Sequence, residues 1–112
     1  MLHALARHGR FGLTVDATGD VEIDPHHTVE DVGIAIGQAL KAALGDRAGI
    51  DRYGFAYAPL DEALARVVID CSGRPYLEYR AEFPEAVIGR DFAASLVEEF
   101  WRSLAVNAGL TV

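Results

Sequence analysis

Residues 24–40 read DPHHTVEDVGIAIGQAL, and their pattern predicts a helix that packs closely against another part of the chain. We expect the helix over residues 28–44, with Gly45 ending it. Gly33 and Gly37 stand four residues apart, so they share one face that a neighbouring element can approach. Apolar residues recur at the spacing of one helix face, at positions 29, 32, 36, 39, 40 and 43.

The start of this helix has two interpretations. Asp24 is a suitable N-cap residue, and Pro25 suits the first helical position. Alternatively, Thr28 followed by Asp31 resembles a capping box in which Asp replaces Glu. Either start explains the helix, but neither explains the two adjacent histidines that lie between Pro25 and Thr28.

The side chains of His26, His27 and Glu30 form a candidate metal site. Neutral imidazole and carboxylate groups are common metal ligands. His26 lies four residues and His27 three residues before Glu30, so either histidine can converge with Glu30 on one ion. The two histidines point about 100° apart on a helix and do not comfortably share an ion. The pattern therefore indicates two ions, or one ion shared with another segment or subunit.

The donor types narrow the choice of metal. The set holds nitrogen and oxygen donors and no thiolate, which favours a six-coordinate metal such as Mn²⁺ over a structural zinc. The alternative interpretation is that these residues only cap a helix.

The rest of the chain predicts strands and two further helices around the central one. A strand at 11–17 and another at 21–24 are expected to form a hairpin, and residues 49–61 are expected to be a loop. Further strands are expected at 63–71, 76–83 and the last few residues. The helices are expected over residues 1–9 and after an N-cap at Asp91, the latter with Phe92, Leu96, Phe100 and Leu104 on its apolar face. This order predicts an α/β fold.

Composition limits the classes of function. A chain of 112 residues suits one domain, and half of it is apolar, so it can bury a core. The net charge of −7 argues against binding to nucleic acid or to an anionic membrane surface. The single cysteine, Cys71, excludes a disulfide framework and indicates a reducing cytoplasm. The first ten residues, MLHALARHGR, hold no long apolar segment, so we expect neither a signal peptide nor a membrane anchor.

Several runs together resemble one enzyme family over the whole chain. They are, in order, HHTVEDVGIAIGQALKAALGDRAGIDRYG, PLDEAL, DCSGRPYL and LVEEFWRSLAVNAGLT. These runs are similar to imidazoleglycerol-phosphate dehydratase, a hydro-lyase of histidine biosynthesis. The resemblance implies a two-layer α/β sandwich, with a mixed four-stranded sheet and helices on one face. The family repeats this unit, which is of the ribosomal protein S5 domain 2-like type, twice. Residues 1–112 would form a single domain equal to about one repeat in a shifted phase.

The resemblance also implies a metal-assisted elimination. The family removes water from imidazole glycerol phosphate to give imidazole acetol phosphate, with two Mn²⁺ ions per site. His26, His27 and Glu30 match the first of two H-H-x-x-E motifs, in which adjacent histidines serve different ions. The resemblance also implies a catalytic role for Glu30. It does not identify the general base.

Other residues match positions that contact the substrate. Arg52 and Arg74 match positions that bind the substrate phosphate, and arginine suits this because its planar fork donates two hydrogen bonds. Each is otherwise an ordinary surface arginine. His8 matches a histidine near the substrate, or is a polar residue at a helix C-terminus. Asp61 lies on a family motif without a chemical role.

The family pattern extends beyond these 112 residues. A preceding Asp-His pair, a second H-H-x-x-E and a late Ser and Lys of the family have no counterpart here, so the chain carries three of the family's eight metal ligands. We therefore expect the 112 residues by themselves to be inactive or poorly active, and the alternative is a structural or metal-binding module. The resemblance also implies sites formed between subunits of a 24-subunit shell. The exposed face of residues 76–83 and the glycine-marked helix are candidate contact surfaces.

Overall fold

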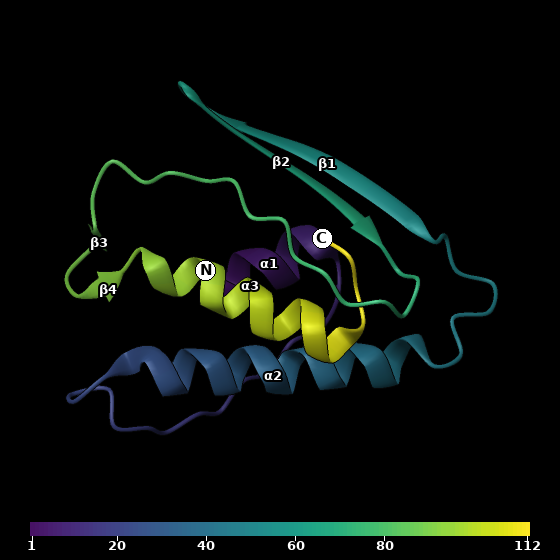
Figure 1. The fold of residues 1–112 in the computed structure, drawn as a ribbon, viewed down its shortest axis with the longest axis horizontal. Coiled ribbons are helices and arrows are strands. Elements are labelled where there is room, and N and C mark those ends of the chain that lie inside the picture. Colours follow the sequence, from purple (N-terminus) through teal and green to yellow (C-terminus); the bar gives the residue numbers. More distant parts are fainter.

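The computed structural model describes residues 1–112 and confirms the α/β class (Figure 1). Three helices and four strands follow one another along the chain. In order they are α1 (Leu2–Gly9), α2 (Pro25–Leu44), β1 (Tyr53–Leu60), β2 (Ala63–Asp70), β3 (Val87–Ile88), β4 (Phe92–Ala93) and α3 (Ser95–Ala108).

Helix α2 begins at Pro25 rather than at residue 28, because Asp24 is its N-cap. The Oδ1 atom of Asp24 accepts a hydrogen bond of 2.9 Å from the backbone N–H of His26. This bond satisfies one of the free N–H groups at the helix start. Of the two predicted starts, the structure has the Asp24–Pro25 cap, which places both histidines in the first turn. Gly45 follows the last residue, as predicted.

The glycine face of α2 packs against α3. A Cβ atom added to Gly33 would lie 2.9 Å from the carbonyl oxygen of Phe100, and one added to Gly37 would lie 2.6 Å from that of Leu104. The backbones therefore meet where a side chain has no room, which confirms the predicted close approach. Because this approach takes place within the chain, the glycine face is not available as a contact surface between subunits.

The hydrophobic core lies between this helix pair and the end of β2. Leu104, Ala108 and Leu110 are its buried centre. Partly buried side chains pack around them from α2, α3 and the sheet: Ile36, Leu40, Leu44, Ile69, Cys71, Phe100, Trp101 and Val112. Leu96 is also buried, so the predicted apolar face is confirmed for Leu96, Phe100 and Leu104 but not for Phe92, which precedes the helix.

The predicted start of α3 was wrong. Asp91 lies between β3 and β4, and the helix begins at Ser95 after Ala94. The short pairing of Val87 with Ala93 places Phe92 in a strand, so the chain cannot turn into the helix at Asp91.

Strands β1 and β2 form an antiparallel hairpin, from the pair Tyr53–Asp70 to the pair Leu60–Ala63. The strand at 63–71 was predicted, but the loop at 49–61 was wrong. Gly54 and Pro59 suggested a loop, whereas the alternating aromatic residues are typical of a strand. Pro59 is tolerated because β1 pairs only with β2, so its other edge has no partner for an N–H group.

The mixed four-stranded sheet is present only in reduced form. Two separate two-stranded sheets, β1–β2 and β3–β4, contain the regular strands. Thr111 bridges Asp70 in antiparallel and Tyr76 in parallel direction, so residues 110–112 lie between the end of β2 and residues 76–78. The four adjacent segments are β1, β2, residues 110–112 and residues 76–78, and their directions are mixed parallel and antiparallel, as predicted. The expected strand at 76–83 is only a bridge, because its partner runs beside it for three residues. Leu77 and Tyr79 are nevertheless less exposed than their neighbours.

The predicted hairpin of residues 11–24 was also wrong, because neither segment is a strand. The carbonyl oxygen of Asp20 accepts hydrogen bonds from the N–H groups of Ile23 (2.8 Å) and Asp24 (3.2 Å). These bonds fold the second segment into a turn that leads directly into α2, and a residue held in such a turn cannot join a ladder.

None of the three helices combines the length and the apolar composition that a membrane-spanning helix needs.

Candidate functional site

The first turn of α2 brings two of the predicted metal ligands together. The Nε2 atom of His26 lies 3.9 Å from the Oε2 atom of Glu30, and both side chains are about two-fifths exposed. Positions 26, 30, 33 and 37 follow one another at helical spacing. The pair therefore continues the glycine face and points toward α3.

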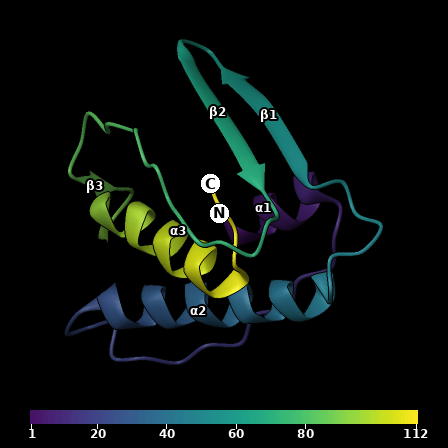
Figure 2. The ribbon, with the colours of Figure 1, turned by 45° about the vertical axis from the view of Figure 1, so that its right-hand side comes forward.

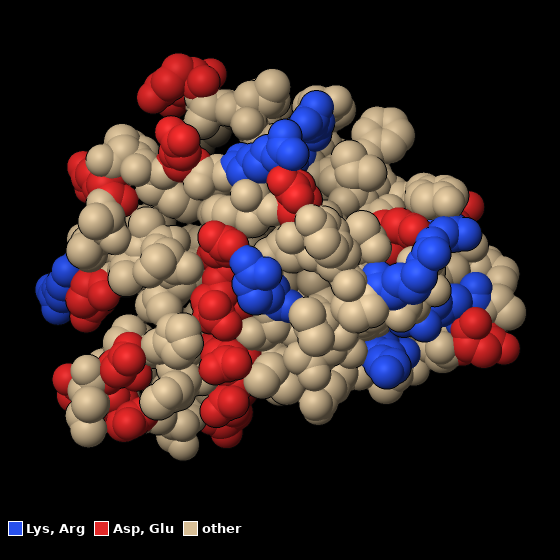
Figure 3. All heavy atoms as spheres, in the orientation of Figure 1, with Lys and Arg blue, Asp and Glu red and all other residues tan.

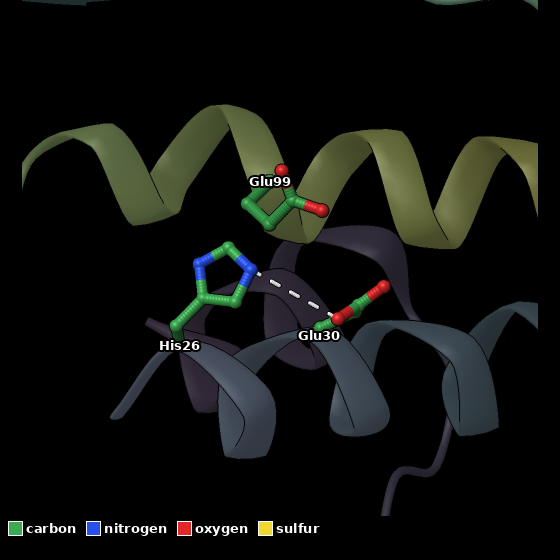
Figure 4. Close-up of side chains that lie close together, drawn as sticks. All are labelled: His26, Glu30 and Glu99. Atoms are coloured by element: carbon green, nitrogen blue, oxygen red, sulfur yellow. Dashed lines mark ion pairs between the residues drawn. The ribbon is translucent and has the colours of Figure 1, made fainter. Parts of the chain in front are cut away.

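A second carboxylate, and a third donor in all, joins this pair from α3. Glu99 offers an oxygen atom, and one donor atom from each of His26, Glu30 and Glu99 lies within 4.8 Å of the other two (Figure 4). We call these three residues the His–Glu–Glu cluster. All three side chains are half-buried. One imidazole nitrogen and two carboxylate oxygens suit a divalent cation that prefers nitrogen and oxygen donors, and Mn²⁺ is such a cation.

Sequence reasoning missed Glu99. Its neighbour Phe100 was assigned to the apolar face of the last helix, and the run LVEEFWRSLAVNAGLT, which contains Glu99, was not given a metal ligand. The only signal was indirect. The glycine face of α2 predicted a closely packed neighbour, and the last predicted helix has an acidic residue, Glu99, directly beside its apolar face.

His27 lies outside the cluster. Its side chain is exposed, and its ring lies 5.9 Å from that of His26 between centroids, at an interplanar angle of 79°. The two ring planes are therefore nearly perpendicular, which is compatible with the predicted divergence of adjacent residues on a helix. Within the chain, Glu30 pairs with His26 and not with His27.

Arg52 lies at the base of the β1–β2 hairpin in a two-bond ion pair with Asp70. Its Nε atom donates to Oδ1 at 2.7 Å, and its Nη2 atom donates to Oδ2 at 3.0 Å. The hydrogen bonds from Arg52 lower the pKa of Asp70, and the same contact raises the pKa of Arg52. The guanidinium carbon also lies 4.9 Å from the centroid of the Tyr53 ring, which is within the range of a cation–π contact.

Arg74 belongs to the same neighbourhood. Its positive charge adds to the lowering of the Asp70 pKa, after the larger effects of Arg52 and of a hydrogen bond from Ser72. Its carbonyl oxygen accepts a 2.9 Å hydrogen bond from Thr111 Oγ1, which holds the backbone of the turn. Asp70 pairs with Arg52 and forms no ion pair with Arg74, so the guanidinium group of Arg74 has no carboxylate partner in the chain and is suited to an anion such as phosphate. We call Arg52 and Arg74 the arginine pair.

The remaining predicted residues lie apart from both groups. His8 is exposed in the last turn of α1 and belongs to neither the His–Glu–Glu cluster nor the arginine pair. Asp61 lies at the tip of the hairpin with φ of 48°, in the left-handed region that Asp adopts more readily than most residues.

The His–Glu–Glu cluster and the arginine pair lie toward opposite ends of α2 (Figure 1). The cluster is at the helix start, whereas Arg52 follows the helix end and the base of the hairpin lies beside that end. A helix of 20 residues is about 30 Å long. In Figure 3, acidic side chains form a column across the first halves of α2 and α3, and basic side chains gather on the right. One chain therefore separates the predicted cation site from the predicted phosphate site.

Comparison with known proteins gives a class and then a family. The fold matches a crystal structure of imidazoleglycerol-phosphate dehydratase from Staphylococcus aureus, with a TM-score of 0.89 and 44% identity, over 98% of this chain and 61% of that one. Two curated relatives of that name are 58% identical (Nitrosococcus oceani) and 55% identical (Bacillus subtilis) over 112 residues, which is 56% and 57% of their lengths.

The family model described as imidazoleglycerol-phosphate dehydratase matches residues 1–112. The chain belongs to the imidazoleglycerol-phosphate dehydratase family, a family of hydro-lyases. It spans about half the length of the curated relatives that it matches.

Proposed function

We propose that this chain contributes to a Mn²⁺-dependent imidazoleglycerol-phosphate dehydratase, which removes water from imidazole glycerol phosphate to give imidazole acetol phosphate in histidine biosynthesis. The observation that carries the proposal is the family match over residues 1–112, in which the H-H-x-x-E run folds as the first turn of α2 with His26 and Glu30 side by side. The cytoplasm is the proposed location, since the chain has one free cysteine and no disulfide.

The metal ligands of the proposal are His26, His27 and Glu30. Mn²⁺, when bound, would act as a Lewis acid toward the imidazole ring of the substrate. His26 and Glu30 lie together at the helix start and His27 is exposed outside their group, which supports two separate ions rather than one. Glu30 then acts in catalysis through the ion that it holds.

The phosphate ligands of the proposal are Arg52 and Arg74. A guanidinium group has five N–H donors, and Asp70 engages two atoms of Arg52, so further N–H groups are available to a phosphate oxygen. Asp70 holds the fork in one orientation, which lowers the entropy that Arg52 loses when a phosphate binds. His8 is proposed to lie near the substrate.

Assembly of several copies is part of the proposal. A small substrate cannot span a separation on the order of 30 Å, so its ring and its phosphate would meet residues of different copies. The accessible surface of 8570 Å² also exceeds the roughly 6000 Å² expected for a folded monomer of 12.1 kDa. A homo-oligomer, a 24-subunit shell by the resemblance, would cover the excess.

The test is a chimera in which residues 1–112 replace the matching segment of the Bacillus subtilis relative. We expect Mn²⁺-dependent turnover of imidazole glycerol phosphate. Loss of hydrogen bonds to a charged group, about 1.5–3 kcal/mol, predicts that Arg52→Ala raises KM by about 10- to 100-fold. Arg66→Ala, at an exposed position of β2, is the matched control and should change KM less than about twofold. A folded, assembled chimera without turnover would refute the proposal.

A further inference from the structure

We propose that Glu99 of α3 is a third donor to the cation that His26 and Glu30 hold, so that α3 takes part in the metal site. This inference rests on the proposed function, because it concerns the same cation. The ligand class is a divalent cation that prefers nitrogen and oxygen donors, for which Mn²⁺ is the probe.

The position of Glu99 is set by helix packing rather than by a loop. The next residue, Phe100, has its carbonyl oxygen 2.9 Å from where a Cβ of Gly33 would stand, and Ser103 lies against the same glycine. Such a contact leaves α3 little freedom to slide along α2 or to rotate on it. Glu99, one residue before Phe100, is therefore held above His26 and Glu30 (Figure 4). A donor on a rigid element suits a metal site, because its geometry is maintained without the metal.

The distances suit a shared ion. Around an octahedral ion with ligands at about 2.1 Å, neighbouring donors lie about 3 Å apart and opposite donors about 4.2 Å apart. The donors of the His–Glu–Glu cluster all lie within 4.8 Å of one another, and the His26–Glu30 separation is 3.9 Å. Small rotations of the two long glutamate side chains are enough to reach bonding distance.

The charges point the same way. The neighbouring Glu98 forms an ion pair with Arg102 one turn later on α3. Glu99 has no such arginine or lysine partner, and the only ion pair of Glu30 is with His26. Two half-buried carboxylates thus converge without a fixed positive charge, an arrangement that repels itself and that a divalent cation neutralises.

The experiment measures Mn²⁺ binding to the full 112-residue chain, by the electron paramagnetic resonance signal of free Mn²⁺. Removing a donor or its support from a metal site typically costs 10- to 100-fold in affinity, so we expect Glu99→Gln to weaken Mn²⁺ binding at least about 10-fold. Glu98→Gln is the matched control on the same turn and should stay within about twofold of the unchanged chain. The rise in Tm that Mn²⁺ causes should shrink in Glu99→Gln and persist in Glu98→Gln.

Two further variants separate the possible failures. Glu99→Asp retains the charge but shortens the side chain by one methylene group, so its Mn²⁺ affinity should fall between those of the unchanged chain and Glu99→Gln. This variant tests the inference separately if Glu99→Gln folds poorly. If His26→Ala weakens binding and both Glu99 variants bind as the unchanged chain does, the inference about Glu99 is wrong and the proposed metal site remains. If the unchanged chain binds no Mn²⁺, or His26→Ala has no effect, the inference about Glu99 is wrong, whereas the proposed function is decided separately by the turnover of the chimera.

Discussion

The α2–α3 pair and the β1–β2 hairpin both carry apolar side chains, but they place them in opposite environments. The helices bury theirs against each other, with Leu104 only 4% exposed. The hairpin shows its apolar residues to solvent, with Phe55 77% exposed and Leu64 65% exposed. Figure 2 shows the hairpin extending away from the helices, which it meets only near the end of β2.

The difference concerns what each region needs for its stability. The helix pair is complete within the chain, because glycines let the backbones meet and each apolar stripe covers the other. The hairpin is paired along the full length of its two strands but has no layer over either face. An isolated two-stranded hairpin is marginally stable in water. We therefore expect the helix pair to supply most of the free energy of unfolding. We expect the exposed apolar residues of the hairpin to contact another protein surface.

The largest expected effect comes from one leucine in each region. Leu104→Ala leaves a cavity at the centre of the core and should lower the free energy of unfolding by about 2–5 kcal/mol. Leu64→Ala, the same substitution on the exposed hairpin, should cost less than about 0.5 kcal/mol. Urea unfolding followed by circular dichroism measures both. Equal losses would contradict the contrast between the regions.

A pair of glycines gives the next effect. Gly37→Ala places a methyl group 2.6 Å from a carbonyl oxygen, so we expect a loss of about 1–3 kcal/mol despite the better helix propensity of alanine. A methyl group at Gly54, in β1, meets nothing within 4 Å. Gly54→Ala should therefore be neutral or slightly stabilising in the same unfolding measurement. If Gly37→Ala stabilises the chain, the close packing described for the helix pair is wrong.

Self-association should depend on the hairpin and not on the stability of the monomer. Phe55→Ser removes an exposed aromatic side chain and should change the unfolding free energy by less than about 0.5 kcal/mol. At an interface a buried aromatic residue is typically worth more than 1 kcal/mol, so the association constant should fall about 10-fold. Sedimentation velocity measures it, with Ala56→Ser on the opposite face of β1 as the control. Unchanged association of Phe55→Ser would show that this face is not the contact.

The smallest effect concerns the acid dependence of the hairpin base. Arg52 lowers the pKa of Asp70 in the folded chain, so this pair stabilises the fold above the ordinary aspartate pKa, and the stabilisation is lost as the pH falls through the lowered value. Asp70→Asn should therefore flatten the decline of stability at acid pH, measured as Tm against pH between 2 and 6. Glu82→Gln is the control. A decline as steep in Asp70→Asn as in the unchanged chain would refute this assignment.

Local patterns predicted those parts of the fold that depend on neighbours along the chain. The cap at Asp24, the apolar period of α2, the stripe of Leu96 and Leu104 and the β-branched run of β2 each follow from residues within one element. The predictions failed where strand pairing, or the choice between a strand and a turn, decides the local structure. Residues 11–24 alternate like strands but end in a turn at Asp20, and β1 carries Gly and Pro yet pairs along its full length.

The candidate site divides in the same way. The sequence by itself determined that His26 and Glu30 share a side of a helix start, that His27 diverges from them, and that Gly33 and Gly37 leave room for a neighbour, because helical spacing sets all three. Only the tertiary structure decided that Glu99 fills the space above the first pair, that Asp70 holds Arg52, and that cation and phosphate residues lie toward opposite ends of α2. The physical reason is distance along the chain: these contacts join residues that local conformation does not relate, and packing of the glycine face and pairing of the hairpin bring them together.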